Sequence, residues 1–365
     1  MSSESREAKA EKIRRLMAAE GDAVGENTRG FNRGRYESVA RLDDYEGLKD
    51  EARAIKEDAI ERLPELVEQL RETVEANGGT VYLADERDAD SVVKSKSMTS
   101  EEIDVNDGLE AAGVDVVETD LGEWVLQVAD DAPSHLVAPA VHKSREGIAE
   151  LFNEQFEPEE PLETAEELTT FARERLGELI EDADVGMTGA NFVTADTGTV
   201  ALVTSEGNAR KSTVVPDTHV AVAGVEKIVP NVEDLRPFVE LVGRSGTGQD
   251  ITSYVSLFTP PVDSPTVDFD NRDDPGFGHG DDDGAADREF HLVLVDNGRM
   301  AMREDDQLRE TLYCIRCSAC ANSCANFQHV GGHAFGGETY TGGIATGWEA
   351  GVHGLDSAAE FNDLC

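Results

Sequence analysis

Residues 190–225, ANFVTADTGTVALVTSEGNARKSTVVPDTHVAVAGV, decide the fold class of this chain. They contain three short β-rich runs, ANFVTA, GTVALVT and HVAVAGV, separated by Gly, Asn and Asp turn residues. Upstream, Thr164-x-x-Glu167 forms a capping box, which predicts a helix from about Thr164 to Ile180. Because strands alternate with helices, the chain is predicted to be α/β, with a largely parallel or mixed sheet covered by helices.

Further elements are predicted on both sides of this stretch. Additional strands are expected at TVYLA (80–84), VDVVETD (114–120), WVLQVA (124–129) and FHLVLVDNG (290–298). Helices are expected at residues 5–19, 48–76 with a new start at Pro64, 146–156 and 305–313.

Three regions follow from this pattern. Residues 1–79 are expected to form an N-terminal helical region, residues 80–300 the α/β domain, and residues 301–365 a cysteine-bearing segment. Within the α/β domain, residues 263–289 are rich in Asp, Gly and Pro and their apolar residues follow no period. They predict an acidic exposed loop.

The chain is strongly acidic. Of its 365 residues, 76 are Asp or Glu and 32 are Lys or Arg, which gives a formal net charge of −44. So large a negative field argues against nucleic acid or an anionic membrane as a partner. The acidic surface suits the high salt of a halophilic, haloarchaeal-like cell, where charge repulsion is screened. No run is long enough to span a bilayer and no apolar signal core begins the chain, so a cytoplasmic location is expected.

Four of the five cysteines lie in the run CIRCSACANSC, at Cys314, Cys317, Cys320 and Cys324. This is the C-x2-C-x2-C-x3-C spacing of bacterial-type ferredoxins, in which three thiolates reach three corners of one cube. The fourth cysteine of such a run typically serves a second cluster. The spacing therefore predicts a 4Fe–4S cluster and an electron carrier.

Two other uses of these cysteines are less compatible with the spacing. Structural zinc usually takes separated pairs of ligands, and a third cysteine so close is unusual for it. Disulfides are not expected in a chain with no export signal and one other thiol. Ala325 stands where the ferredoxin run normally has proline, so Cys324 is a less certain ligand than the first three.

Long ordered segments cover most of the chain from about residue 46 and match one known family. They include VVKSKSMTSEEI (92–103), GMTGANFVTADTGTVALVTSEGNAR (186–210), HVAVAGVEKIVPNVEDL (219–235), EFHLVLVDNGR (289–299) and CIRCSACANSCANFQHVGGHAFGG (314–337). In these segments the chain resembles the LutB-type lactate utilisation family, whose members carry a LUD domain and a ferredoxin-type iron–sulfur module.

The resemblance implies a fold like that of the NagB, RpiA and CoA-transferase group, with N-terminal helices and a C-terminal helical ferredoxin-like segment. It also implies two 4Fe–4S clusters, and two partners: a cysteine-rich LutA-like subunit and a second LUD protein of LutC type. Together such subunits are thought to oxidise L-lactate to pyruvate.

The C-terminus departs from the family pattern. Relatives continue with a second cysteine motif, whereas this chain stops at Cys365, the first cysteine of that motif. Two cubane clusters need about eight thiolates, so five cysteines support at most one. Either Cys365 supplies a further ligand or the chain is a fragment, and we expect the fragment.

The α/β domain offers candidates for binding a small organic acid. Lys94-Ser95-Lys96-Ser97 places two cations and two hydroxyls before a predicted helix, an arrangement that suits a carboxylate or phosphate but also a solvated loop. Further candidates lie at predicted strand ends, where α/β sheets usually place ligands: Asn191, Glu206 and Asn208. Glu206 is a weak catalytic candidate, by analogy with the nucleophilic glutamate of CoA-transferase folds.

Three functions remain open on the sequence. The first is an electron-transfer subunit of a lactate-oxidising complex, in which the chain is a component of an oxidoreductase. The second is an enzyme of acyl or CoA transfer in which the cluster is structural. The third is a redox-sensing interaction protein.

Overall fold

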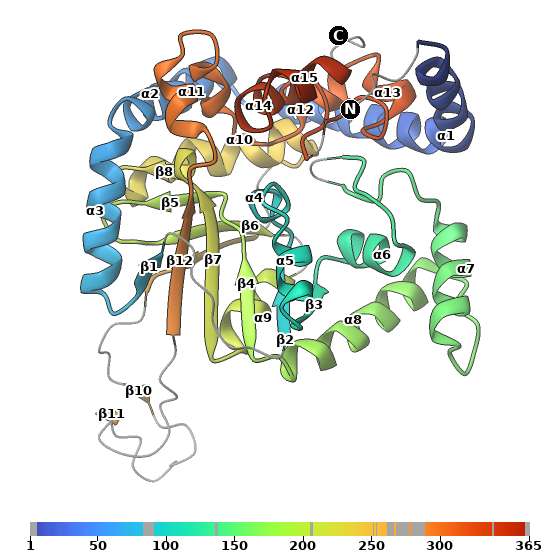
Figure 1. The fold of residues 1–365 in the computed structure, drawn as a ribbon, viewed down its shortest axis with the longest axis horizontal. Helices are drawn as coiled ribbons and strands as arrows, with labels where there is room; N and C mark the ends of the chain where they lie inside the picture. The colour runs from blue at the N-terminus through green and yellow to red at the C-terminus, as the bar shows by residue number, and fades with distance from the viewer. Residues whose placement is uncertain are drawn as a thin grey trace.

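Two β-sheets form the centre of the molecule (Figure 1). The structure, a computed structural model, describes residues 6–82, 91–135, 138–204, 207–250, 252, 254–260, 266–267, 277–278, 289–337 and 339–361. The larger sheet has six parallel strands in the order β1-β12-β7-β4-β2-β3. Their bounds are β1 (Thr80–Tyr82), β2 (Ser91–Lys94), β3 (Asp115–Glu118), β4 (Val185–Thr188), β7 (Thr218–Gly224) and β12 (Glu289–Val295).

The smaller sheet has four strands in the order β8-β5-β6-β9. They are β5 (Phe192–Thr194), β6 (Val200–Thr204), β8 (Ile228–Val229) and β9 (Tyr254–Phe258). The pairs β5–β6 and β6–β9 are antiparallel, whereas β5 and β8 are parallel. The prediction of an α/β fold with parallel and mixed sheets is therefore confirmed. Of the predicted acidic loop, the described residues are the short antiparallel pair β10 (Thr266–Val267) and β11 (Phe277–Gly278) and its last residue, Glu289, which begins β12.

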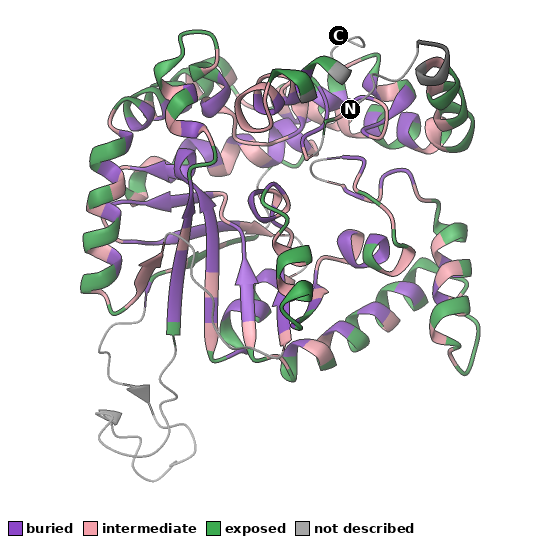
Figure 2. Cartoon of the chain, in the orientation of Figure 1, coloured by how far each residue is buried: buried purple, intermediate pink, exposed green. Residues whose placement is uncertain are grey.

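The central strands are apolar on both faces because helices cover both sides of the sheet (Figure 2). Strand β7 lies between β12 and β4, with Ala221 opposite Leu292 and Thr188. Gly186 in β4 allows α9 (Asn208–Val214) to approach, since a Cβ there would meet the Ser212 carbonyl oxygen.

The order of the strands creates a switch point between β2 and β4. From β2 the chain proceeds outward to β3, and then returns to place β4 on the opposite side of β2. In open parallel sheets, ligands bind outside the carboxyl ends of the strands at such a point. Lys94 and Thr188, the last residues of β2 and β4, mark this position.

The N-terminal helices are longer than the sequence suggested. Helix α1 spans Arg6–Val39, well beyond the predicted 5–19, because its second half packs against α10, α12 and α13 despite the glycines it contains. Helices α2 (Tyr45–Glu61) and α3 (Leu63–Ala76) confirm the break before Pro64, which lies in the first turn of α3.

The middle of the chain contributes most of the remaining helices. These are α4 (Met98–Glu101), α5 (Val105–Ala111), α6 (Leu121–Ala129), α7 (Arg145–Phe156), α8 (Ala165–Glu181) and α10 (Arg236–Gly246), with 3-10 turns η1 (Val225–Lys227) and η2 (Val232–Leu235). The predicted capping box is present: Thr164 caps α8 and Glu167 bonds back. No described helix has the length and apolar character that a transmembrane span requires.

The strand predicted at WVLQVA (124–129) is wrong. These residues lie in α6, where Trp124 and Val125 are buried. The helix forms because Asp120 caps its N-terminus, accepting hydrogen bonds from the Gly122 and Glu123 N–H groups. A short apolar run carries no period that separates a buried strand from a buried helix.

The C-terminal segment covers the upper edge of the large sheet in Figure 1. It contains α11 (Arg299–Glu304), the 3-10 turn η3 (Arg309–Tyr313), α12 (Ala319–Ser323), α13 (Phe327–Val330), α14 (Ala345–Val352) and α15 (Leu355–Phe361). The helix predicted at 305–313 is replaced by turns and η3. The Asp305 carboxylate accepts hydrogen bonds from the Gln307 and Leu308 N–H groups there, which competes with a continuous helix.

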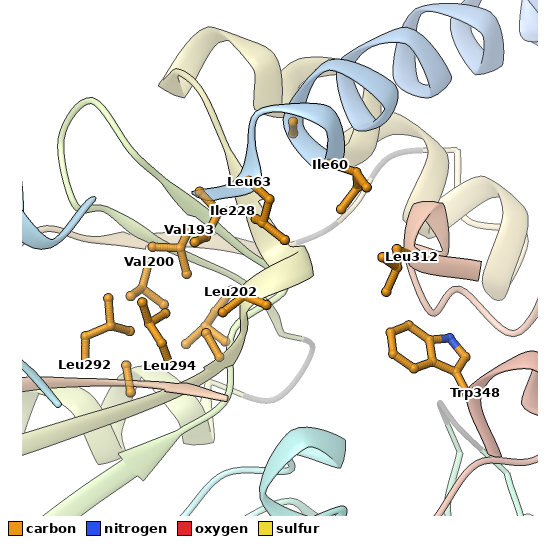
Figure 3. Close-up of a cluster of buried hydrophobic side chains, with 14 of the residues drawn as sticks. Ile60, Leu63, Val193, Val200, Leu202, Ile228, Leu292, Leu294, Leu312 and Trp348 are labelled. Carbon is orange, nitrogen blue, oxygen red and sulfur yellow. The ribbon is translucent and has the colours of Figure 1, made fainter. Parts of the chain in front are cut away.

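One hydrophobic core joins this segment to the sheets (Figure 3). Ile60 and Leu63 come from the N-terminal helices, Leu202 and Leu294 from the two sheets, and Trp348 from α14. All are buried. The cysteine-bearing segment and the α/β domain therefore share a core.

Candidate functional site

The cysteine loop has an unusual backbone. Arg316 and Ser318, on either side of Cys317, have φ values of +57° and +63°. Left-handed residues in such loops turn successive N–H groups toward one point, which forms the anion-binding concavities found at many iron–sulfur sites. Non-glycine residues adopt this conformation at a cost, and they concentrate at functional sites.

Backbone N–H groups point to all four thiols. The Arg316 N–H donates to Cys314 Sγ over 3.3 Å, and the Phe327 N–H donates to Cys324 Sγ over 3.5 Å. The amides of Ala319 and Ile344 donate to the sulfurs of Cys317 and Cys320. Such donors stabilise bound thiolates and tune the metal they hold.

Two of these thiols are held in the neutral form. Burial raises the pKa of Cys317 to about 12 and also raises the pKa of Cys320. Both therefore keep their protons at neutral pH until a cation takes the place of the proton.

The cysteine loop is wider than a zinc site. Around one tetrahedral zinc ion with Zn–S bonds of about 2.3 Å, sulfurs lie about 3.8 Å apart. Asp131, His142 and His333 are the three metal-binding side chains of the described residues whose donor atoms lie within 4.8 Å of one another. No three cysteine sulfurs of the described residues come this close together.

Positive charge is in excess beside the loop. Four cations, three of them buried and one partly buried, gather around Glu226 beside Cys314, and within the described part of the chain two carboxylates, Glu102 and Glu226, contact them. The cations are Lys56, Lys227, Arg299 and Arg316. A 4Fe–4S cube held by four thiolates is anionic, so this excess has the sign that such a group needs.

Lys227 shows this excess of positive charge most clearly. The residue is 3 % exposed and lies beside Glu226, Lys56 and Arg316. Burial, and then the like charge of Arg316, lower the pKa of Lys227 to about 7. A buried lysine is costly unless an anion lies beside it, and its anionic neighbours are Glu226 and Cys314.

Several buried polar atoms of the cysteine-bearing segment also lack partners in the described structure. They are Ser318 Oγ, Thr341 Oγ1, Arg316 Nε and Trp348 Nε1. Buried polar atoms are nearly always paired, and each exception points to strain or to a missing group. Together with the N–H donors and the cations, they are what an anionic cluster bound through Cys314, Cys317 and Cys320 would need.

A buried ionic network ties the loop to the α/β domain. Arg299 binds Glu102 through two hydrogen bonds of 2.7 and 2.8 Å, and its Nε contacts Glu226. Arg316, from the cysteine loop, lies 2.9 Å from Glu226. The indole of Trp348 stacks near both guanidinium groups, 5.2 and 4.8 Å from its centroid. Opposing charges and aromatic faces thus fix the cysteine loop on the sheet edge.

The predicted lysines lie at the switch point. Lys94 Nζ is 2.7 Å from Glu118 Oε1, and Lys96 Nζ is 2.6 Å from Glu123 Oε1. Burial, reinforced by Glu123, raises the pKa of Glu101 to about 7. Each ammonium already has a carboxylate partner, so an incoming anion has to displace one.

The neighbouring candidates have mainly structural contacts. The Ser95 N–H donates to the Met187 carbonyl, and Ser97 caps α4. Asn191 Oδ1 accepts from the Val203 N–H over 2.8 Å, which places it at the smaller sheet. Asn208 donates to Thr119 Oγ1, which also donates to the Lys94 carbonyl. Asn208 therefore lies beside the two predicted lysines, whereas Asn191 lies at the smaller sheet. Small-molecule binding at these residues stays a prediction. Glu206 and Cys365 lie outside the described residues.

Two cavities lie near these elements. One, of about 420 Å³, is lined by β2, β3 and α8 and contains none of the predicted binding residues. The other, of about 10 Å³, lies between Lys96, Glu101, His135, Thr339 and Thr341 and has room for about one water. The smaller cavity is thus where the switch point meets the cysteine-bearing segment.

Sequence reasoning missed two histidine contacts at this boundary. His135 Nδ1 accepts from the Ala138 N–H, so its Nε2 donates to Asn322 Oδ1, in the cysteine run, over 2.9 Å. Burial lowers the pKa of His135 to about 4, which keeps the ring neutral. His142 approaches His333, with ring centroids 4.5 Å apart. No short-range signal marks these pairs, because nearly two hundred residues separate the partners.

Comparison with known proteins identifies the family of this chain. Residues 67–272 match the LUD domain family. The chain is 38 % identical over 352 residues to lactate utilization protein B of Oceanobacillus iheyensis, covering 92 % of this chain and 70 % of that protein. It is 43 % identical over 310 residues to lactate utilization protein B of Shouchella clausii, covering 81 % and 61 %.

Two further similarities complete the comparison. The chain is 39 % identical over 338 residues to the Escherichia coli uncharacterized electron transport protein YkgF, covering 89 % of this chain and 66 % of that protein. A crystal structure of a DUF162 family protein from Deinococcus radiodurans aligns at 13 % identity over 64 % of this chain and 98 % of that one. Its TM-score of 0.28 is too low to support any inference.

The chain thus spans between 61 % and 70 % of the length of these relatives. Its LUD match covers more than half of its residues, and its sequence identity to the relatives extends through the cysteine run. The chain belongs to the LUD-domain family and is a homologue of lactate utilization protein B.

Proposed function

We propose that the chain is the iron–sulfur electron-transfer subunit of a system that oxidises L-lactate to pyruvate. The observation that carries the proposal is the cysteine loop, whose four thiols face backbone N–H groups beside a buried lysine. The names of its relatives, lactate utilization protein B and electron transport protein, favour the same role. A bound 4Fe–4S cluster supplies one-electron transfer.

The residues of this chain would bind and tune that cluster. Cys314, Cys317 and Cys320 would hold it, with Cys365 as the candidate fourth ligand, Cys324 would serve a second cluster, and Lys227 with Lys56 would offset its negative charge. Lactate oxidation releases two electrons and two protons, so a partner has to perform that step and pass the electrons on singly. We propose a cysteine-rich LutA-like subunit and a LutC-like LUD subunit as partners, in the cytoplasm.

The cluster is tested first. The chain is purified without oxygen, iron and sulfide are counted, and the reduced protein is examined by EPR. We expect iron and sulfide in a cubane ratio in the wild type and their loss in Cys317→Ser. Colourless protein that carries zinc in place of iron would contradict the proposal. In cells, Cys317→Ser should abolish growth on L-lactate, and unchanged growth would remove the lactate role while leaving the cluster in place.

Lys227→Met then tests the electrostatic fit. Removing a buried positive charge disfavours the more negative, reduced cluster, so the reduction potential should fall by on the order of 50–100 mV at unchanged iron content. Lys49→Met is the control, because it removes one positive charge from an exposed position. A potential equal to that of the wild type would show that Lys227 does not face the cluster.

A further inference from the structure

We infer that Asp131, His142 and His333 form a binding site for one divalent transition-metal ion, zinc in the first instance, apart from the cysteines. One donor atom from each residue lies within 4.8 Å of the other two. Imidazole and carboxylate together suit zinc or ferrous iron, whereas calcium and magnesium prefer oxygen ligands alone. The inference does not depend on the proposed electron-transfer function.

The distances match coordination of one ion. His142 Nε2 lies 3.2 Å from Asp131 Oδ2. Around a tetrahedral zinc with bonds of about 2.0–2.1 Å, two ligand atoms are about 3.3 Å apart. The rings of His142 and His333 meet at 61°, with centroids 4.5 Å apart, so they approach from different directions rather than stacking.

The outer nitrogen of each ring already has a partner. His142 Nδ1 lies 2.6 Å from Ser134 Oγ, and His333 Nδ1 lies 3.1 Å from Glu20 Oε2. Metal-bound histidines almost always donate their second N–H to such a group, which fixes the tautomer and the ring orientation. In His333 the nitrogen on the side of Asp131 is Nε2, which donates to the carbonyl of Ala132, next to Asp131, over 2.8 Å. A bound ion has to take the place of this proton.

A lysine competes for the site. The Lys143 ammonium contacts Asp131 Oδ2, where it supplies the positive charge that a metal ion would supply. The side chains of Lys143 and Asp131 are 28 % and 29 % exposed, so the ammonium can turn into solvent when an ion binds. Removing this charge should strengthen metal binding, an effect that a merely structural ion pair does not predict.

The site would join three parts of the chain. Glu20 belongs to α1, Asp131 and His142 to the loop before α7, and His333 to the turn after the cysteine run. Three protein ligands leave one position for water or another small ligand, as in open zinc sites.

Cobalt(II) titration of the full-length chain tests the inference, with zinc added in competition. Cobalt bound by nitrogen and oxygen lacks the sulfur-to-cobalt charge-transfer band of cysteine-bound cobalt, so the two kinds of site are read separately. We expect one nitrogen–oxygen site per chain. Cobalt binding at this site should be lost in His142→Ala and His333→Ala. Its affinity should be roughly 10–100-fold weaker in Glu20→Gln and tighter in Lys143→Met. Affinity should be unchanged in His329→Ala, which alters an exposed neighbour.

Each outcome decides the inference. A wild-type chain with no nitrogen–oxygen cobalt signal overturns it, and so does a signal that both histidine variants retain. If the histidine variants do not fold, Glu20→Gln and Lys143→Met decide: unchanged affinity in both overturns the site. Because the readout excludes sulfur-bound metal, a missing iron–sulfur cluster would leave this test intact.

Discussion

Single buried carboxylates and lysines give this chain its local chemistry. Glu101 faces Glu123 and Lys96 at the switch point, with Lys94 and Glu118 behind them. Burial and the negative charge of Glu123 raise the pKa of Glu101 from 4.5 to about 7. Near neutral pH this carboxyl therefore exchanges a proton beside the cavity that borders the cysteine-bearing segment.

Glu101→Gln should change the pH dependence of stability in one direction. A carboxyl whose folded pKa is raised binds its proton more tightly in the folded state, so wild-type stability falls as pH rises from about 4.5 to about 7. The glutamine variant lacks this loss. Its free energy of unfolding relative to the wild type should therefore rise across that window and level off above it, as urea unfolding at each pH would measure.

Exposed Glu110→Gln serves as the control and should run parallel to the wild type. Other groups titrate equally in both proteins and cancel in the difference. A Glu101→Gln curve that also runs parallel to the wild type would show that Glu101 is not held protonated.

At the scale of elements, the end of α10 positions the cysteine loop. Gly246, its last residue, lies so close to the loop that a Cβ there would be 2.7 Å from the Cys317 carbonyl oxygen. The Asn322 side chain also donates to the Gly246 carbonyl over 2.8 Å. Helix α10 and the cysteine run are therefore in direct backbone contact.

Gly246→Ala should displace Cys317. The added methyl forces the loop backbone to move, at a cost of about 1–3 kcal/mol, and we expect a lower iron content after anaerobic reconstitution. Gly343→Ala is the matched control: its Cβ would meet Cys320 Cβ at 3.8 Å, an ordinary contact. Equal iron content in the two variants would refute the positional role of Gly246.

Element type was predictable where local signals were strong. The capping box at Thr164 and the break at Pro64 are local rules, and both hold. The run at 124–129 misled because its apolar residues suit either a strand or a helix, and the N-cap at Asp120 decides between them. The length of α1 was missed because its stability comes from tertiary packing as well as from its own sequence.

At the scale of the whole molecule, Arg299 joins the α/β domain to the cysteine-bearing segment. Its side chain is fully buried between Glu102 and Glu226, and Glu226 also holds Arg316 of the cysteine loop. Arg299→Met should lower the free energy of unfolding by about 3–5 kcal/mol, because it leaves buried carboxylates without their cation. Urea unfolding measures this change.

Arg236→Met provides the comparison. Arg236 is paired with Glu51 at 2.7 Å, but the arginine side chain is 72 % exposed, so its loss should cost at most about 1 kcal/mol. If the two variants are equally stable, the buried network does not hold the segment in place.

The candidate sites were predictable only in part, for a physical reason. The cysteine spacing is encoded within eleven residues, so it could be read directly from the sequence. Lys227 and His142 lie far along the chain from Cys314 and His333, and only the fold brings them near. Lys94 and Lys96 were found by their proximity in sequence, but their pairing with Glu118 and Glu123 depends on how β2, β3 and α6 pack.

Helix α1 lies against the cysteine run, and Arg35 donates to Ser323 across 288 positions. At about 5–20 residues per second, a ribosome needs roughly 15–60 s to synthesise that interval. The first helix therefore emerges long before α12 and α13, against which it packs, and it can dock there only when the cysteine run has been translated. For that interval the helix lacks the cysteine run that packs against it, so the final conformation of the two together has to form after the run is synthesised rather than while α1 emerges.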